Sequence, residues 1–153
     1  MPQRVIKPLN AILVSGNPIY EEYELEGTVT YAYPGKLVVP GTYTYQCQIA
    51  DANSPDVIGV LDVMPDKKLT TMYSTSTPYA LGDQVRVIRG DCVVMLRGDH
   101  SASITVGTKV EAGDEGNVIT SVTALADIGI AEEGHTGGAG ESDGWIVVKL
   151  HGV

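Results

Sequence analysis

Short apolar runs alternate with polar residues along this chain, and Gly or Pro interrupts them every few residues. In residues 101–106, for example, Ala102, Ile104 and Val106 face one way and the hydroxyl side chains face the other. This period of two, together with abundant β-branched residues, predicts half-buried strands, and the frequent breakers leave no room for long helices. The predicted strands cover residues 27–33, 36–39, 42–49, 56–63, 84–89, 92–96, 101–106, 107–112, 117–124, 126–131 and 145–150.

Turn signals connect these runs. Pro34-Gly35 and Pro40-Gly41 fit type II turns, in which Pro fixes φ and Gly accepts the positive φ. The tripeptide Arg-Gly-Asp occurs twice, at residues 89–91 and 97–99. Because Gly-Asp is good turn chemistry between strands, we expect the first copy to close a hairpin and the second to turn the chain again.

The organisation that follows is a single all-β domain preceded by an arm. Residues 27–153 are expected to form a small β-barrel or β-sandwich of short antiparallel strands, with a loop rich in Gly and acids at 132–144. Residues 1–26 contain three prolines and mixed charge, which predicts an extended arm. Its apolar residues are too many for a solvated tail, so the arm lies either on its own domain or on a neighbour.

One short sequence echo links the two halves of the body. Asp56-Val-Ile-Gly-Val-Leu-Asp-Val63 resembles Ala126-Asp-Ile-Gly-Ile-Ala131 around a central Gly. Gly inside a strand often marks a tight bend at a barrel corner. Two similar strands of this kind are compatible with equivalent corners of a barrel, although the echo by itself is too short to prove a repeat.

Charge and hydropathy exclude two partner classes. The chain has 10 Lys and Arg against 19 Asp and Glu, a formal net charge of −9, and it has no basic cluster. Binding to nucleic acid through its phosphates requires a basic surface, so no nucleic-acid partner is expected. Apolar runs are far shorter than the roughly 20 residues of a membrane-spanning helix, so no membrane partner is expected either.

Candidate chemistry is sparse. The two cysteines, Cys47 and Cys92, lie in no metal-binding pattern and are expected to be free buried thiols rather than a disulfide. The three histidines are scattered, and the Gly-rich stretch lacks the Lys-Ser/Thr ending of a phosphate loop. Because no nucleophile, base and orienting group gather anywhere, we expect no enzyme, no catalytic residue, no metal and no cofactor. We read the Arg-Gly-Asp copies as turns, not as adhesion motifs.

A series of segments resembles the small β-barrel decoration, or cement, proteins of tailed bacteriophages and related archaeal viruses. The segments that carry the resemblance are Pro34-Gly-Lys-Leu-Val38, Asp56-Val-Ile-Gly-Val60, Ala80-Leu-Gly-Asp-Gln-Val-Arg-Val-Ile-Arg-Gly-Asp91, Ile104-Thr-Val-Gly-Thr108, Ile128-Gly-Ile-Ala131 and Ile146-Val-Val-Lys-Leu150. The resemblance implies a structural virion protein that is made in the host cytoplasm, sits on the outer capsid surface as a homotrimer, and stabilises the shell without any cofactor.

The partner that the resemblance implies is the major capsid protein. Residues 1–26 match no pattern of that family, yet an extended arm suits attachment to a shell. Our hypothesis is therefore that Arg4, Ile6, Lys7 and Leu9 contact the capsid or a neighbouring copy. The alternative function is a receptor- or carbohydrate-binding module, for which Tyr31, Tyr33, Tyr43 and Tyr45, alternating along two predicted strands, would form either an aromatic face or part of the core.

Overall fold

The computed structural model describes residues 12–27, 30–63, 79–99, 103–122, 126–134 and 144–153. It contains nine strands and one 3₁₀ turn, which confirms the predicted all-β class. The elements are β1 (Leu13–Leu25), β2 (Leu37–Pro40), β3 (Gln46–Ile49), β4 (Gly59–Leu61), β5 (Gln84–Gly98), β6 (Lys109–Ala112), η1 (Asp114–Gly116), β7 (Val118–Thr120), β8 (Gly129–Ala131) and β9 (Gly144–Leu150).

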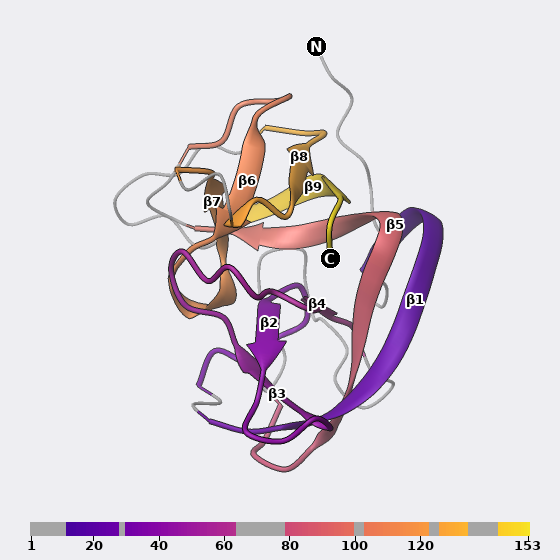
Figure 1. Cartoon of the computed structure of the whole chain (residues 1–153). Helices are drawn as coiled ribbons and strands as arrows, with labels where there is room; N and C mark the ends of the chain where they lie inside the picture. The colour runs from indigo at the N-terminus through magenta and orange to yellow at the C-terminus, as the bar shows by residue number, and fades with distance from the viewer. Residues whose placement is uncertain (1–11, 28–29, 64–78, 100–102, 123–125, 135–143) are drawn as a thin grey trace.

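The strands form one mixed sheet that closes on itself twice. Its order is β1-β3-β2-β4-β5-β7-β6-β8-β9, and the additional pairings β1–β5 and β5–β9 complete two rings of five strands. We call β1, β3, β2, β4 and β5 the first ring, and β5, β7, β6, β8 and β9 the second ring. Figure 1 shows the second ring above the first, with the bent β5 common to both.

The predicted hairpin at Gly90-Asp91 is wrong. Residues Gln84–Gly98 form one continuous strand, and Gly90 (φ 96°) allows it to bend without reversing. The first part of β5 lies between β1 and β4, whereas its last residues lie between β9 and β7. Most strands are short and pair antiparallel, as predicted, but β1 and β5 are long, and the pairs β1–β3 and β5–β7 are parallel, which makes the sheet mixed.

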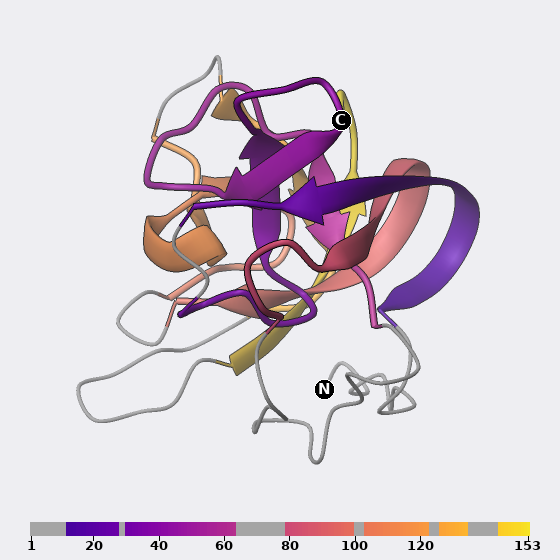
Figure 2. The same ribbon diagram turned by 90° about the horizontal axis from the view of Figure 1, so that it is seen from below.

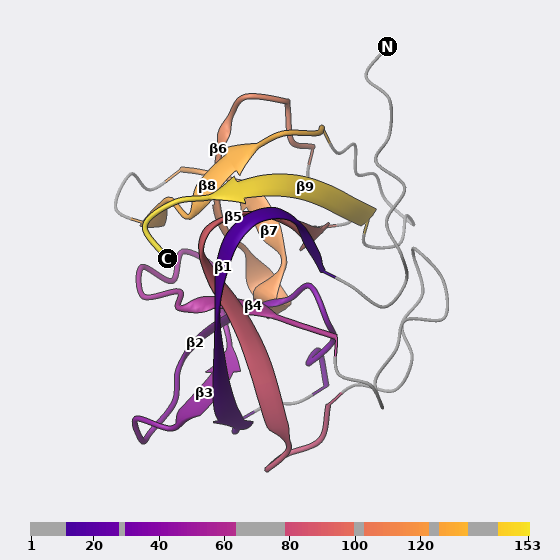
Figure 3. The same cartoon turned by 90° about the vertical axis from the view of Figure 1, so that its right-hand side faces the viewer.

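The second half of the predicted arm belongs to the sheet. Leu13–Leu25 forms β1, which pairs antiparallel with β5 from Leu13 opposite Val94 to Glu24 opposite Gln84. Figure 3 shows these two strands running side by side beneath β9. Ile12, just before β1, is fully buried in the core. Residues 1–11, the rest of the predicted arm, lie outside the described residues, as do 135–143 of the predicted loop.

The two rings repeat one another strand by strand. In each ring a long strand pairs parallel with the third strand, which pairs antiparallel with the second, and the second pairs with a short Gly-containing strand. Gly59 lies opposite Val38 in the first ring, and Gly129 lies opposite Val110 in the second. The sequence echo at residues 56–63 and 126–131 therefore marks equivalent strands, β4 and β8.

Backbone hydrogen bonds outside the strand ladders repeat as well. Corresponding N–H to C=O bonds have nearly equal lengths in the two rings: Gly35 to Leu61 (2.9 Å) and Gly107 to Ala131 (2.8 Å); Ile58 to Val38 (2.9 Å) and Ile128 to Val110 (2.9 Å); Ala50 to Leu37 (3.0 Å) and Ser121 to Lys109 (2.8 Å). Such agreement between turns as well as strands indicates that the described part of the chain contains two copies of one five-strand unit that have β5 in common.

Each ring has its own apolar interior. The first-ring cluster takes residues from all five strands, namely Leu25, Val38, Cys47, Leu61, Val85 and Val87, together with Ala32 and Tyr79. Figure 2 shows the molecule from below, with the first ring nearest the viewer. A larger cluster fills the second ring and extends to the outer side of β2 and β4, through Leu37 and Val60. The two rings are thus packed against each other and are not separate domains connected only by a linker.

One contact between the rings, besides their common apolar cluster, is made by the β6–β7 turn, Gly113–Asn117. Gly116 N donates to Ala50 O at 2.8 Å, and Lys36 Nζ donates to Asn117 Oδ1 at 2.5 Å. A Cβ on Gly116 would lie 2.9 Å from Ile49 Cγ2 and 3.0 Å from Leu37 O, so only Gly permits this close approach. The turn of the second ring therefore covers the β2–β3 face of the first.

Candidate interaction site

The most prominent exposed feature is an aromatic turn between β2 and β3. Tyr43 and Tyr45 are 60% and 57% exposed, and their rings stack with centroids 5.8 Å apart and planes 6° from parallel. Residues 42–45 were predicted as strand, but they form a turn because Gly41 N bonds Gln46 O at 2.8 Å and Gln46 N bonds Tyr43 O at 2.9 Å. We call residues 40–46 the tyrosine turn.

Two carboxylates of the β1 end hold the tyrosine turn in place. Gln46 Nε2 donates to Glu24 Oε1 at 3.0 Å, and the backbone N–H of Thr42 donates to the Glu26 carboxylate. Beside the rings lies a shallow hollow of about 340 Å³ lined by Tyr23, Ile58 and residues of the turn itself. Exposed rings held by this framework present a preorganised surface of the kind that contributes most to protein recognition.

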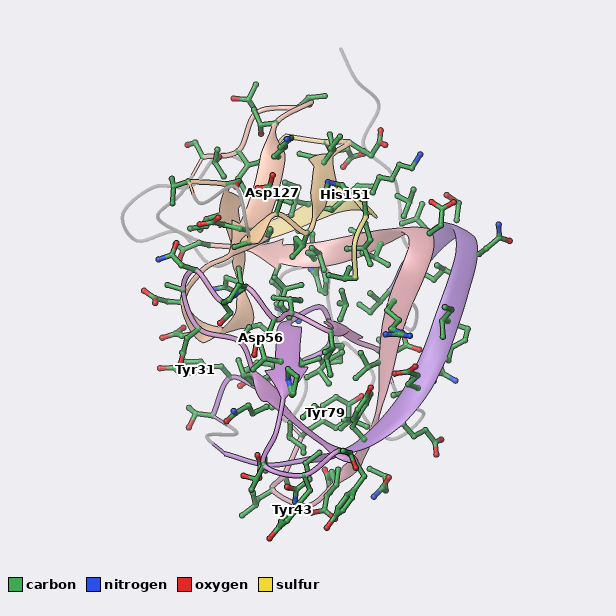
Figure 4. The ribbon with its side chains drawn as sticks, viewed as in Figure 1. Tyr31, Tyr43, Asp56, Tyr79, Asp127 and His151 are labelled. Atoms are coloured by element: carbon green, nitrogen blue, oxygen red, sulfur yellow. The ribbon has the colours of Figure 1, made fainter. Side chains whose placement is uncertain are left out.

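The other two tyrosines of the predicted aromatic face lie elsewhere. Tyr31 contacts the second ring, where its side-chain hydrogen bond with Glu115 raises the pKa of the Tyr31 phenol. Tyr33 lies against the Arg97 guanidinium, whose central carbon is 5.7 Å from the centre of the ring. Figure 4 shows Tyr31 at the side of the molecule and Tyr43 at the lower tip. The four tyrosines therefore do not share one platform.

A second open surface lies on the second ring, at the other end of the molecule. It is a hollow of about 480 Å³ lined by Thr108, Lys109, Thr120, Ser121, Val122 and Asp127. Val122 is 78% exposed, an unusual position for an apolar side chain of this size. We call it the second-ring hollow.

Polar side chains hold the floor of the second-ring hollow. The Ser121 hydroxyl contacts both Glu111 Oε2, at 3.2 Å, and the Asp127 carboxylate. Lys109 Nζ lies 3.6 Å from Asp127 Oδ2. Glu111 is fully buried beneath them. The contacts in this cluster link β6 to Ser121, directly after β7, and to Asp127, two residues before β8.

The first Arg-Gly-Asp copy lies inside β5, and the second copy contains the last two residues of β5 followed by Asp99. Arg97 is 3% exposed; its Nε donates to Pro34 O at 2.9 Å, and its guanidinium lies 4.4 Å from the centre of the Trp145 ring. Arg89 pairs with Glu21 on β1, with Nε and Oε1 3.3 Å apart. The expectation of a turn is therefore wrong for the first copy, because β1 and β9 offer β5 partners on both sides of Gly90. At the second copy β5 ends at Gly98, as the sequence predicted, and residues 100–102 lie outside the described residues.

The cysteine prediction is confirmed, since Cys47 and Cys92 are both free and buried. Burial raises the pKa of the Cys47 thiol to about 12. Within the described ranges no three His, Cys, Asp or Glu side chains gather in a way that could hold a metal ion. The described helical structure, a single 3₁₀ turn, includes no segment able to span a membrane.

The proposed contact residues Arg4, Ile6, Lys7 and Leu9 lie outside the described residues, so their role stays a prediction. Sequence reasoning missed both the tyrosine turn, which it assigned to a strand, and the second-ring hollow. The available signal for the first was the Gly41-Thr-Tyr-Thr-Tyr-Gln46 stretch directly after Pro40. Nothing in the sequence pattern indicated the hollow, which depends on a face that the fold leaves open.

Comparison with known proteins informs about the fold. No protein-family model matches the chain, and no curated protein does either. Among solved structures, the fold is similar to the crystal structure of the head fiber gp8.5 N base in bacteriophage phi29, with a TM-score of 0.55 and 14% sequence identity. The match covers 88% of this chain and 95% of that one. At this identity the comparison shows a common fold over nearly the whole length of both chains.

Proposed function

We propose that this chain is a structural protein of a phage virion that binds the outer surface of an icosahedral capsid as a trimer and stabilises it. The observation that carries the proposal is the end-to-end fold similarity with the N base of a bacteriophage head fiber. The sequence resemblance to decoration proteins supports the same role, and its segments overlap β2, β4, β5, β8 and β9, while the segment Ile104–Thr108 lies directly before β6.

The physical properties of the fold suit that role. A shell under pressure from packaged DNA needs a clamp that resists deformation and binds through several modest contacts in parallel. The two closed rings, which share β5 and are joined by the buried Lys36–Asn117 hydrogen bond, make a compact body with few free strand edges. Three copies at one site would add avidity without requiring a strong single interface.

The partner in this proposal is the major capsid protein, with contact made through Arg4, Ile6, Lys7 and Leu9. The structure defines how to test it. Ile12 is fully buried and Leu13 begins β1, so a truncation that ends at residue 11 removes the proposed contact residues and leaves the core intact.

The experiment is co-sedimentation of the purified chain with bare shells of its phage. We expect the full chain to pellet with the shells, and the chain lacking residues 1–11 to stay in the supernatant while it keeps the circular dichroism spectrum of the full chain. A full chain that ignores shells would contradict the proposed function. Truncation without effect on pelleting would contradict only the assignment of the contact residues.

A second candidate is carbohydrate binding, and the exposed stacked rings of Tyr43 and Tyr45 favour it. Aromatic rings flanked by amide and hydroxyl groups such as those of Gln46 and Thr44 are suited to a sugar ring with its hydroxyls. A glycan array tests this function. Specific binding that disappears in a Tyr43→Ala/Tyr45→Ala variant would support it, and an empty array would discard it.

A further inference from the structure

The internal repeat gives a direction to the contact between the β6–β7 turn and the first ring, because the two sides of that contact come from different parts of the repeated unit. The β6–β7 turn of the second ring sits on the first-ring face formed by Lys36, Leu37 and the end of β3. This is a head-to-tail contact, since the turn comes from one unit and the face from the preceding one. Each unit of the repeat has both a turn and a face, so the first ring has a turn, and the second ring a face, that can take part in an equivalent contact with another copy.

Both equivalent surfaces are open here. The first-ring counterpart of the β6–β7 turn is the tyrosine turn, and the alignment is fixed by matching bonds, Gln46 N to Tyr43 O (2.9 Å) and Asn117 N to Asp114 O (3.1 Å). The second-ring counterpart of the covered face is the second-ring hollow. Its lining residues correspond in order to first-ring residues: Thr108 to Lys36, Lys109 to Leu37, Thr120 to Ile49, Ser121 to Ala50, Val122 to Asp51 and Asp127 to Val57.

The two open surfaces cannot meet within one molecule. Figure 4 shows Tyr43 at the lower tip of the first ring and Asp127 near the top of the second. We propose that the tyrosine turn of one copy docks into the second-ring hollow of a second copy, in the position that the β6–β7 turn takes on the first ring within a chain. The occupant of the hollow is thus this same protein, in a heterologous interface.

The chemistry of the two surfaces is complementary. The tyrosine turn offers two exposed rings with hydroxyl ends, and the hollow offers an exposed apolar side chain, Val122, among hydroxyl groups. Lys109, 66% exposed at the hollow, would face a turn flanked by Glu24 and Glu26. The tyrosine turn is one residue longer than its counterpart and has Tyr45 where that turn has Gly116, so the rings would fill the hollow in place of the close backbone approach.

The two faces differ in composition, as expected if one is covered within the chain and the other binds a second copy. The covered face is largely apolar, as expected for a contact formed permanently within a chain, with Leu37, Ala50 and Val57 buried. The hollow has Lys109, Ser121 and Asp127 at the same positions, and an interface between separate copies is more polar than a domain core. The docking of the turn into the hollow does not depend on the proposed function, but the number of copies does. If three copies assemble, as the proposed function has it, their heterologous contacts must close into a ring.

The first test is the mass of the full chain in solution, measured by light scattering at several concentrations. We expect an oligomer that becomes a monomer in the Tyr43→Ala/Tyr45→Ala variant and persists in Tyr20→Ala, a matched control because Tyr20 is 47% exposed on β1, away from both surfaces. A monomeric wild type, or a double variant that keeps the wild-type mass, would overturn the proposal. A double variant that loses glycan binding but stays assembled would assign the turn to sugar recognition instead.

A mixing experiment separates a head-to-tail contact from a symmetric one. Val122→Arg blocks the hollow at an exposed position and leaves the tyrosine turn intact. Each variant alone is expected to be monomeric, whereas an equimolar mixture of the turn variant and the hollow variant is expected to form a dimer, since one intact turn and one intact hollow remain. A mixture that stays monomeric contradicts the head-to-tail contact, while shell co-sedimentation of the wild type tests the proposed function separately.

Discussion

Lys36 Nζ donates a 2.5 Å hydrogen bond to Asn117 Oδ1, and both side chains are only 2% exposed. The two residues are 81 positions apart and come from different rings. A charged donor inside the protein makes this bond stronger than a neutral one. The pair is therefore a specific connection between the two units of the repeat.

Asn117→Ala should destabilise the protein by about 1.5–3 kcal/mol, the range for a hydrogen bond to a charged group. The measurement is the free energy of unfolding from urea denaturation. Lys149→Ala, at an exposed position of β9, serves as the control and should stay within about 0.5 kcal/mol of wild type. Equal effects of the two substitutions would show that the Lys36–Asn117 bond contributes little.

The repeat supplies a matched pair of glycines for a second prediction. Gly35 and Gly107 have φ angles of 88° and 86°, but a Cβ on Gly35 would lie 2.6 Å from Trp145 Cζ3, whereas nothing lies within 4 Å of one on Gly107. Gly107→Ala should cost only the left-handed backbone strain, about 1–2 kcal/mol. Gly35→Ala should cost roughly 1–3 kcal/mol more because of overpacking.

Fluorescence of the single Trp gives an independent readout for this pair. Gly35→Ala should shift the Trp145 emission in the folded state, because the ring has to move, and Gly107→Ala should leave it unchanged. Identical emission and identical unfolding free energies for the two variants would contradict the assigned packing.

The glycines of β4 and β8 form a pair that should behave alike. A Cβ on Gly59 would lie 2.4 Å from Ile88 O, and one on Gly129 would lie 2.3 Å from Lys149 O. Backbone cannot give way as a flexible side chain can, so we expect each Ala variant to lose at least about 2 kcal/mol. Thermal unfolding followed by circular dichroism measures this loss, and tolerance of Ala at either position would argue against equivalent strands.

Cys47 predicts a dependence of stability on alkaline pH. Its thiol has a pKa of about 12 in the folded protein because it is buried, against an ordinary value of 9.0. The unfolded chain therefore loses this proton first as the pH rises, so the contribution is constant below about pH 8.5 and falls by up to about 1.4 kcal/mol per pH unit between 9 and 12. Urea denaturation at pH 8 and 10 should show a steeper loss for wild type than for Cys47→Ala, and parallel losses would refute the assignment.

Some strands could be predicted from the local sequence and others could not. The runs that became β2, β6 and β9 combine a turn signal with β-branched residues, so local preference and final structure agree there. At Gly90-Asp91 the same local chemistry permits either a turn or a bend, and the choice depends on the distant partner β1. Local preference could not decide between them.

The sequence did not predict strand β1 for a related reason. Pro18 and the Glu-rich stretch after it argue against a central strand, yet most of β1 pairs only with β5 among the described strands and so behaves as an edge, where Pro and charge are tolerated. The repeat was visible only around Gly59 and Gly129, because a shared backbone arrangement restricts the positions where a Cβ would collide and leaves the others free to diverge.

The common strand β5 has a consequence for how the protein responds to force and to cutting. Domains joined by a linker can rotate or be separated, but here the boundary between the units lies inside one strand that walls both rings. A nick near Gly90 would leave two fragments that each lack part of a wall, so neither unit should survive as an independent module. For the same reason a force applied to one ring passes directly into the other along the covalent backbone of β5, and the two rings should respond to it as one rigid body.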